Sequence, residues 1–198
     1  MGNLVLNGST SGGITISPPA VAGSNTISLP ANTGTIITTA STGVVTQSML
    51  ASNIAGNGPA FAYQRTATQS IPASTWTKVQ FNTSIFDTNS NYSNTNYRFT
   101  PTVAGYYQFN WLVVMDAIPS NAEMISAIYK NGATYVWGND SYTSSSHYNS
   151  STGSVLLYCN GSTDYAEIFV FQASSGAVNC TPTSTSVSMF SGFMARGA

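Results

Sequence analysis

Charged residues are scarce in this chain of 198 residues. Lysine, arginine, aspartate and glutamate make up 6% of it, against about 25% in an average protein, and the formal net charge is −1. The basic residues are scattered and form no patch that could neutralise nucleic-acid phosphates: Arg65, Lys78, Arg98, Lys130 and Arg196. The composition therefore predicts a protein that binds neither nucleic acid nor an anionic membrane surface.

Long hydrophobic segments are also absent. No run approaches the roughly 18 apolar residues that a membrane-spanning helix needs. The first ten residues, MGNLVLNGST, have neither the basic start nor the apolar core of a secretory signal peptide. We therefore expect a protein made in a cytoplasm and not secreted by the usual route. In that compartment Cys159 and Cys180 are expected to stay reduced, as buried thiols and not as a disulfide.

Residue types that build catalytic and metal sites are few and dispersed. The one histidine, His147, lies in SYTSSSHYNSS, which predicts a loop. A triad with Ser146 and Asp140 is disfavoured, because sequence neighbours rarely face one another in a triad. One histidine and two cysteines cannot build a tetrahedral zinc site, and no acidic segment has EF-hand spacing. We predict no enzyme active site, no metal site and no cofactor.

Aromatic residues, at 12%, and hydroxyl and amide side chains take the place of charge, and no aromatic residue occurs before Phe61. Residues 1–57 contain short apolar pairs at strand spacing, such as Leu4/Leu6, Ile14/Ile16 and Ile27/Leu29, separated by Gly, Pro, Ser and Asn. Residues 47–50 could form one helical turn. This segment buries too little apolar surface to fold alone, so we expect a copy of itself or a larger assembly to order it.

Residues 58–198 carry all the aromatic residues in short alternating runs separated by turn-forming stretches. This pattern predicts many short strands in a sandwich or jelly roll, with residues 117–124 as a loop. The segment from Gly105 to Met115 is apolar at alternate positions on both sides. One side is therefore expected in the sandwich core and the other against neighbouring chains.

The segment from Tyr135 to Ser151 has the composition of a recognition site. Aromatic rings that stack on sugar rings occur here beside amides, a carboxylate and hydroxyls that can bond sugar hydroxyls. Alternatively, Tyr135 and Trp137 are strand residues of the core and only the serine-rich tip is exposed. The candidate ligand-binding residues are Tyr135, Trp137, Asn139, Asp140, Tyr142, His147 and Tyr148.

Two parts of the chain resemble known proteins. PPAVAGSNTISLPANTGTIITT, within residues 14–39, resembles a segment near the N-terminal side of many bacteriophage tail-fibre and appendage proteins. The order FTPTVAGYYQF (99–109), KNG (130–132), SVLLY (154–158) and FSGF (190–193) resembles the C1q-like domain of the C1q/TNF jelly-roll superfamily. The sequence departs from that family in the turn at residues 160–164 and in having no collagen repeat.

The second resemblance implies a jelly roll that assembles as a homotrimer. It also implies core or trimer-packing roles for the residues of its motifs: Phe99, Tyr107, Phe109, Trp111, Phe190 and Phe193. Some proteins of this family bind calcium near the threefold axis, a role that Asp140 or Asp164 could fill, although a solvated turn is the simpler interpretation of either residue.

Together the resemblances predict an all-β structural protein of a bacteriophage particle. Residues 1–57 are expected to form an attachment or stalk segment that contacts other virion proteins. Residues 58–198 are expected to form a trimeric head that binds a glycan or protein of the host-cell surface. The alternatives are a decoration protein of the capsid or neck that binds no receptor and a C1q-like carbohydrate-binding lectin.

Overall fold

The computed structural model describes residues 4–7, 9–17, 24, 31, 50, 56–182 and 187–198. The chain divides into two compact units, residues 1–44 and residues 45–198, and each is described by itself. All regular elements of the described residues are β-strands, which confirms the predicted all-β class, and no helix among them could cross a membrane. The strand predicted at Ile27/Leu29 lies outside the described residues, as does the helical turn predicted at residues 47–50 except for Leu50.

The first unit contains one antiparallel hairpin. Strand β1 (Leu4–Asn7) pairs with β2 (Gly13–Ile16), so that Leu4 lies opposite Ile16. Leu4, Val5 and Leu6 are all more than half exposed, at 57%, 53% and 52%. Since successive strand residues point to opposite faces, the described residues of this unit cover neither face of β1. A two-stranded hairpin of this kind is at best marginally stable in water, so it needs further contacts.

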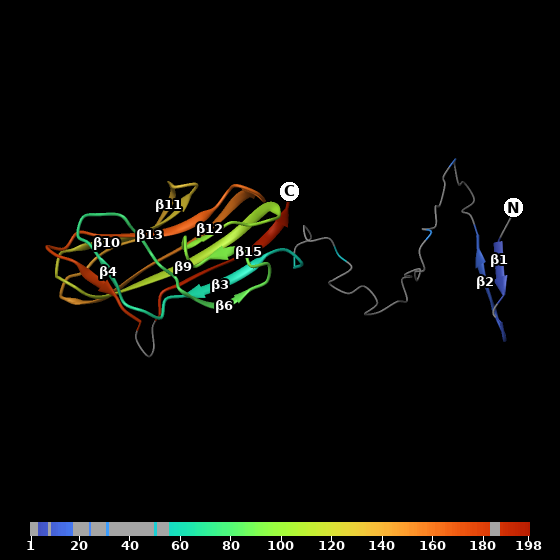
Figure 1. Ribbon diagram of the computed structural model, residues 1–198, viewed down its shortest axis with the longest axis horizontal. Coiled ribbons are helices and arrows are strands. Elements are labelled where there is room, and N and C mark those ends of the chain that lie inside the picture. The colour runs from blue at the N-terminus through green and yellow to red at the C-terminus, as the bar shows by residue number, and fades with distance from the viewer. Residues whose placement is uncertain are drawn as a thin grey trace. The chain divides into compact units, whose positions relative to one another are not determined.

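The second unit is a sandwich of two antiparallel sheets (Figure 1). The six-stranded sheet contains β11 (Ala133–Tyr142), β10 (Glu123–Lys130), β13 (Ala166–Gln172), β8 (Arg98–Phe99) and β7 (Tyr92–Ser93), with β5 (Thr77–Lys78) paired to β13. The five-stranded sheet contains β12 (His147–Asn160), β9 (Ala104–Ile118), β15 (Met189–Gly197), β3 (Ala60–Gln64) and β6 (Thr83–Asp87). A separate pair is formed by β4 (Gln69–Ile71) and β14 (Val178–Cys180).

Strand β9 supplies the centre of the core through alternate residues. Tyr107, Phe109 and Trp111 are buried between the sheets, as the sequence predicts for one side of this strand. From neighbouring strands Phe61 stacks on Phe99, with 4.1 Å between ring centroids, and meets Phe190 edge-on at 4.9 Å. Such pairs add roughly 0.5–1.5 kcal/mol each beyond the burial of their area. The aromatic residues of the FTPTVAGYYQF segment thus serve mainly to hold the two sheets together.

Trp111 is also the polar link between the sheets. Its indole Nε1 donates to Ser126 Oγ at 2.7 Å, and Ser126 Oγ lies 2.7 Å from Ser151 Oγ. Ser126 lies on β10 and Ser151 on β12, so this buried chain of hydrogen bonds connects strands of both sheets. The indole ring covers Gly153, where an added Cβ would lie 1.9 Å from the ring. Only glycine therefore fits beneath Trp111.

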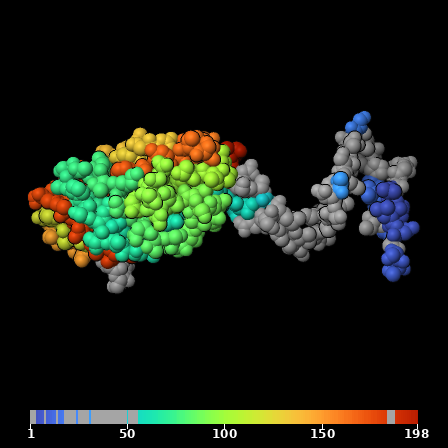
Figure 2. Space-filling view, viewed as in Figure 1, coloured from blue at the N-terminus to red at the C-terminus, as the bar shows by residue number. Residues whose placement is uncertain are grey.

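The connections refine the predicted turns. Asn131 and Gly132 both have positive φ, 53° and 79°, and form a two-residue turn between β10 and β11, as expected for an Asn-Gly pair. The loop predicted at residues 117–124 is shorter, because β9 extends to Ile118 and β10 begins at Glu123. In the view of Figure 2, residues in teal and green, up to about residue 110, cover the middle of the second unit.

Candidate functional site

The outward side of the five-stranded sheet is rich in exposed apolar residues. We call it the five-stranded face and define it by Tyr106, Leu112, Leu156, Tyr158, Met189 and Phe193. Leu156 and Phe193 are 52% and 49% exposed and lie in one cross-strand row with Gln108 between them. Phe193 thus lies on the surface of the single chain and not in its core. At one end of the face, Tyr106, Leu156 and Tyr158 border a hollow of about 550 Å3.

A short polar ladder crosses the middle of this face. Gln108 Nε2 donates to Ser154 Oγ at 2.8 Å, and Ser154 Oγ donates to Asn110 Oδ1, also at 2.8 Å. Gln108 Oε1 and Asn110 Nδ2 take no part in these bonds, so they are free to bond to a surface that covers the ladder. The face as a whole therefore combines exposed apolar residues with a polar strip that is hydrogen-bonded in part.

Five of the predicted ligand-binding residues lie on the edge strand β11 of the other sheet. Tyr135, Trp137, Asn139, Asp140 and Tyr142 belong to β11, an edge strand whose residues are almost all exposed. Tyr135 and Trp137 are therefore strand residues, but at 51% and 57% exposure they do not belong to the core.

His147 and Tyr148 are not in a loop, contrary to the prediction for residues 141–151. They begin β12 and pair with Ile118 and Ala117 of β9. The connection between β11 and β12 is limited to residues 143–146. The two rings lie 6.4 Å apart, edge to face. The prediction failed because serine and asparagine suit turns, whereas pairing with the long strand β9 decides the conformation here.

Asn139 of β11 is hydrogen-bonded to β12 at the edge of the sandwich. Its Oδ1 accepts a hydrogen bond from the backbone N–H of Thr152, and its backbone carbonyl accepts one from Ser151 Oγ at 2.7 Å. A further bond joins Asn149 Nδ2 to Ser141 Oγ at 3.0 Å. These bonds tie β11 to β12, which belong to different sheets, so the Asn139 side chain is occupied in holding the edge together.

Trp137 belongs to an aromatic cluster that the sequence did not reveal. We call it the aromatic face and define it by Trp76, Tyr129, Trp137, Phe169 and Phe171 on the outward side of the six-stranded sheet. Trp76, which directly precedes β5, lies at its centre, with ring centroids 5.6–6.1 Å from those of its three neighbours. The available signal was the alternation of Phe169 and Phe171, but nothing local placed Trp76 beside them.

A shallow hollow of about 200 Å3 opens in the aromatic face. It is lined by Trp76, Trp137 and Phe171, by Ile125 and by the carboxylate-bearing Glu123. Tyr142 hydrogen-bonds to Glu123, and the negative charge of that carboxylate raises the pKa of Tyr142. Asp140 lies opposite Ile125 in the strand register, so a second carboxylate lies on the same side of the sheet as the hollow.

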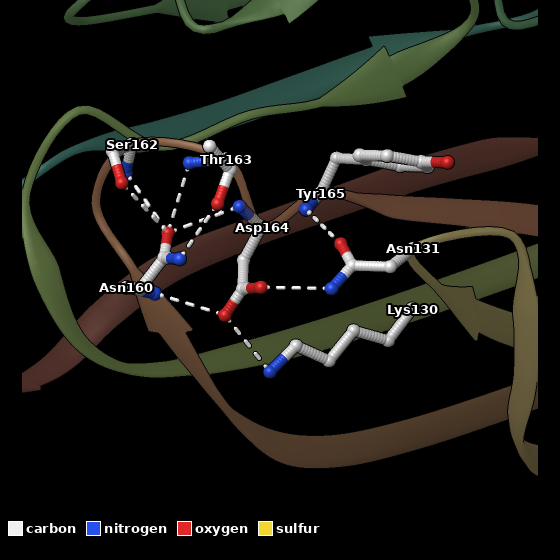
Figure 3. A network of polar contacts seen from close by, with 7 residues as sticks. All are labelled: Lys130, Asn131, Asn160, Ser162, Thr163, Asp164 and Tyr165. Carbon is white, nitrogen blue, oxygen red and sulfur yellow. Dashed lines mark hydrogen bonds and ion pairs between the residues drawn. The ribbon is translucent and has the colours of Figure 1, made fainter.

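Asp164, a weak calcium candidate, is already surrounded by hydrogen-bond donors (Figure 3). Its carboxylate accepts from Asn131 Nδ2 at 2.8 Å and from the backbone N–H of Asn160 at 3.1 Å, and it pairs with Lys130 Nζ at 2.9 Å. The hydrogen bonds to Asn131 and Lys130 lower the pKa of Asp164. Among the residues that the structure describes, no cluster of three or more potential metal ligands occurs. Asp164 thus stabilises the turn.

The same network explains the unusual turn at residues 160–164. Asn160 Oδ1 accepts hydrogen bonds from the backbone N–H groups of Ser162, Thr163 and Asp164 at 2.9–3.0 Å (Figure 3). Gly161 has φ of +71°, and an added Cβ would lie 2.3 Å from the backbone nitrogen of Ala104. The asparagine side chain therefore shapes the turn, and glycine is needed after it.

Cys159 and Cys180 are both free and buried, as predicted. Burial raises the pKa of the Cys159 thiol to about 12 and also raises that of Cys180, whose sulfur lies 3.2 Å from Ser188 Oγ. Thiols of this kind are unreactive because the thiolate is the nucleophile.

The family model of the C1q domain matches residues 60–195. The chain belongs to the C1q domain family. Its fold resembles the globular domain of zebrafish complement 1qA, with a TM-score of 0.54 and 19% identity over 71% of this chain and 99% of that chain. Murine APRIL at pH 5.0 aligns with a TM-score of 0.50 and 9% identity over 69% of this chain and 98% of that one. No curated protein matches the sequence.

These findings establish a C1q/TNF-like jelly roll for the second unit. Domains of this family are typically binding or structural modules, not enzymes, and they commonly form homotrimers. The C1q domain presents two candidate surfaces, the five-stranded face and the aromatic face.

Proposed function

We propose that this protein is a homotrimeric structural component of a bacteriophage particle whose C1q domain binds the host-cell surface. Residues 1–57 attach it to other virion proteins as a short stalk, and residues 58–198 form the head. The resemblance of residues 14–39 to phage tail-fibre and appendage segments supports the virion assignment. The exposed apolar residues of β1 support the attachment role, because they need a partner.

The exposed apolar residues of the five-stranded face are the observation that supports a homotrimer. Exposed residues such as Leu156, Tyr158 and Phe193 would leave water if two further copies covered this side of the sheet. The chain is also almost uncharged, so little like-charge repulsion opposes the approach of identical copies. The ladder of Gln108, Asn110 and Ser154 is bonded in part within the chain, and its remaining amide groups, Gln108 Oε1 and Asn110 Nδ2, would bond to the neighbouring copy.

Two measurements test the proposal. Light scattering of the full chain should give a mass of about three times 20.8 kDa, and a monomer would contradict the homotrimer. Purified protein labelled with a fluorophore should adsorb to cells of a susceptible host and compete with phage for them. A trimer that neither adsorbs nor competes would instead indicate a decoration protein that stabilises the particle without binding a receptor.

A further inference from the structure

We propose that the aromatic face of the six-stranded sheet is a binding site for a neutral glycan. This inference deepens the proposed host attachment and rests on it for biological context. It moves the recognition site away from the tip of the β11–β12 connection and onto the surface around Trp76. Of the residues predicted from the sequence, Trp137, Asp140 and Tyr142 remain part of it.

The rings form a continuous track across the sheet. The centroid of Trp76 lies 6.1 Å from those of Trp137 and Tyr129 and 5.6 Å from that of Phe171. Tyr129 in turn stacks on Phe169 at 4.1 Å. A pyranose ring has one apolar face of C–H groups, and an aromatic ring offers a flat surface to cover it. Since Tyr129 and Phe169 stack on each other, the ring most open to a sugar is Trp137, which is 57% exposed, beside Trp76.

The hollow beside Trp76 provides the polar groups that sugar hydroxyls require. Aromatic residues line it together with Ile125, and Glu123 supplies a carboxylate. Hydrogen bonds from hydroxyls to a carboxylate are stronger than those between neutral groups. At about 200 Å3 the hollow is smaller than the roughly 300–1,000 Å3 of pockets for drug-sized ligands. It suits one sugar ring.

A protein partner fits this surface less well. A stable protein–protein interface buries about 800 Å2 on each partner. A fully buried aromatic side chain covers about 150–250 Å2, and four of the five rings here are already half-buried or more. The exposed parts of the rings therefore fall well short of that area. A glycan needs much less area because it binds through a few stacked rings.

The charges on this face favour a neutral ligand. Lys78 pairs with Glu167, and its Nζ lies 5.7 Å from the centroid of Phe169, so the cation position above that ring is occupied. The nearby carboxylates of Glu123 and Asp140 would repel an anionic polysaccharide. The site therefore offers stacking surfaces and hydrogen-bond acceptors to hydroxyl groups, without a free cation that would select an acidic sugar.

The test is a glycan microarray that carries neutral glycans, acidic glycans and choline-bearing glycans of bacterial surfaces. The array is probed with the labelled full-length protein. We expect retention on at least one neutral glycan. Trp137→Ala should reduce affinity for that glycan about tenfold, because one stacking surface is lost. Val136→Ala is the matched control, since Val136 lies beside Trp137 in sequence but opposite Ile128, on the other side of β11. It should leave binding unchanged.

A second variant tests the alternative that the glycan binds at the β11–β12 edge, where the sequence predicted the site. Tyr148→Ala, at the start of β12, should leave glycan binding unchanged. If Tyr148→Ala abolishes binding while Trp137→Ala does not, the site lies at the β11–β12 edge and the proposal is wrong. Retention of acidic or choline-bearing glycans alone, or of no glycan, would also overturn it.

Host adsorption separates this proposal from the proposed function. If the wild-type trimer adsorbs to host cells and Trp137→Ala adsorbs equally well, host attachment stands and the aromatic face is not its site. If the wild-type trimer binds a neutral glycan but adsorbs to no host, the aromatic face is a glycan site and the attachment role is wrong. Thermal unfolding of each variant checks that the exposed substitutions leave the fold intact.

Discussion

The two outward faces of the sandwich are both apolar, but their residues are arranged differently. On the five-stranded face the exposed residues Tyr106, Leu156 and Phe193 are spread over three long strands, with a hydrogen-bonded polar ladder between the two ends. On the aromatic face the rings touch one another around Trp76 and border a small hollow with a carboxylate. A broad apolar surface crossed by a polar strip suits a copy of the same chain, whereas a small group of rings around a hollow suits a small ligand.

The comparison assigns different functions to similar residue types. An exposed Tyr or Phe on either sheet has the same chemistry, and only its neighbours distinguish an assembly surface from a ligand site. Substitutions that affect one face and spare the other are therefore the most direct tests.

The largest effect is expected on the five-stranded face. Leu156→Asp would place one carboxylate per chain in the trimer interface. An unpaired buried carboxylate would destabilise the trimer by several kcal/mol. Light scattering should then give the mass of a single chain, 20.8 kDa. Trp137→Asp is the corresponding change on the aromatic face and should leave the mass of the trimer unchanged. Equal effects of the two variants would remove the distinction between the faces.

The next largest effect is expected from the core that both faces share. Gly153→Ala would place a Cβ 1.9 Å from the Trp111 ring, and overpacking of this kind costs about 3 kcal/mol. Denaturant unfolding should show the loss of stability. The fraction of trimer and the affinity for glycan should fall together. Gly176→Ala is the control, because nothing lies within 4 Å of its added Cβ. A stable Gly153→Ala protein would mean that Trp111 can move without cost.

A somewhat smaller loss is expected where the two sheets are linked by hydrogen bonds. Ser126→Ala removes the partner of Trp111 Nε1, and leaving this buried N–H unpaired costs about 2 kcal/mol, whereas Ser151 Oγ keeps its bond to the Asn139 carbonyl. Denaturant unfolding measures the difference from the wild type. Ser175→Ala, at an exposed serine between β13 and β14, should change stability little. Equal stability of the two variants would show that the linkage is dispensable.

The smallest effect is expected at the turn that joins β12 of one sheet to β13 of the other. The pKa of Asp164 is lowered in the folded state, so its carboxylate stabilises the fold above the ordinary aspartate value of about 3.9, and this contribution is lost as pH falls through the lowered pKa. Asp164→Asn should therefore lower Tm at pH 7, and the difference from the wild type should shrink in acid. A difference independent of pH would contradict this role.

Most of the fold could be predicted from the sequence because local signals and long-range packing agree. Alternation placed Tyr107, Phe109 and Trp111 in the core, and the turn-forming Lys130-Asn131-Gly132 indicated the turn that the structure shows. Phe193 shows the limit of this reasoning. The FSGF motif indicated that Phe193 packs in the core or in a trimer interface. Alternation alone could not say whether the Phe193 side of β15 faces the core or the outside of the sheet.

The candidate site was predicted less well because it is assembled from distant segments. Trp137 and Asp140 were identified from the composition of one strand, whereas Trp76 reaches the same place from a position about 60 residues earlier. Asn139 was predicted to bind ligand, yet it serves the edge of the sandwich through Thr152. Composition indicates which residues suit a ligand but not which of them already have a partner.

The short connection between β11 and β12 has a practical consequence for engineering. Strands β9 and β12 pair along nearly their whole length, so deleting one residue there would exchange their inward and outward sides. Residues 143–146 join β12 to β11 of the other sheet at the surface and contribute nothing to the core. A foreign peptide inserted between Ser145 and Ser146 would be displayed once per chain on a scaffold whose register it does not disturb.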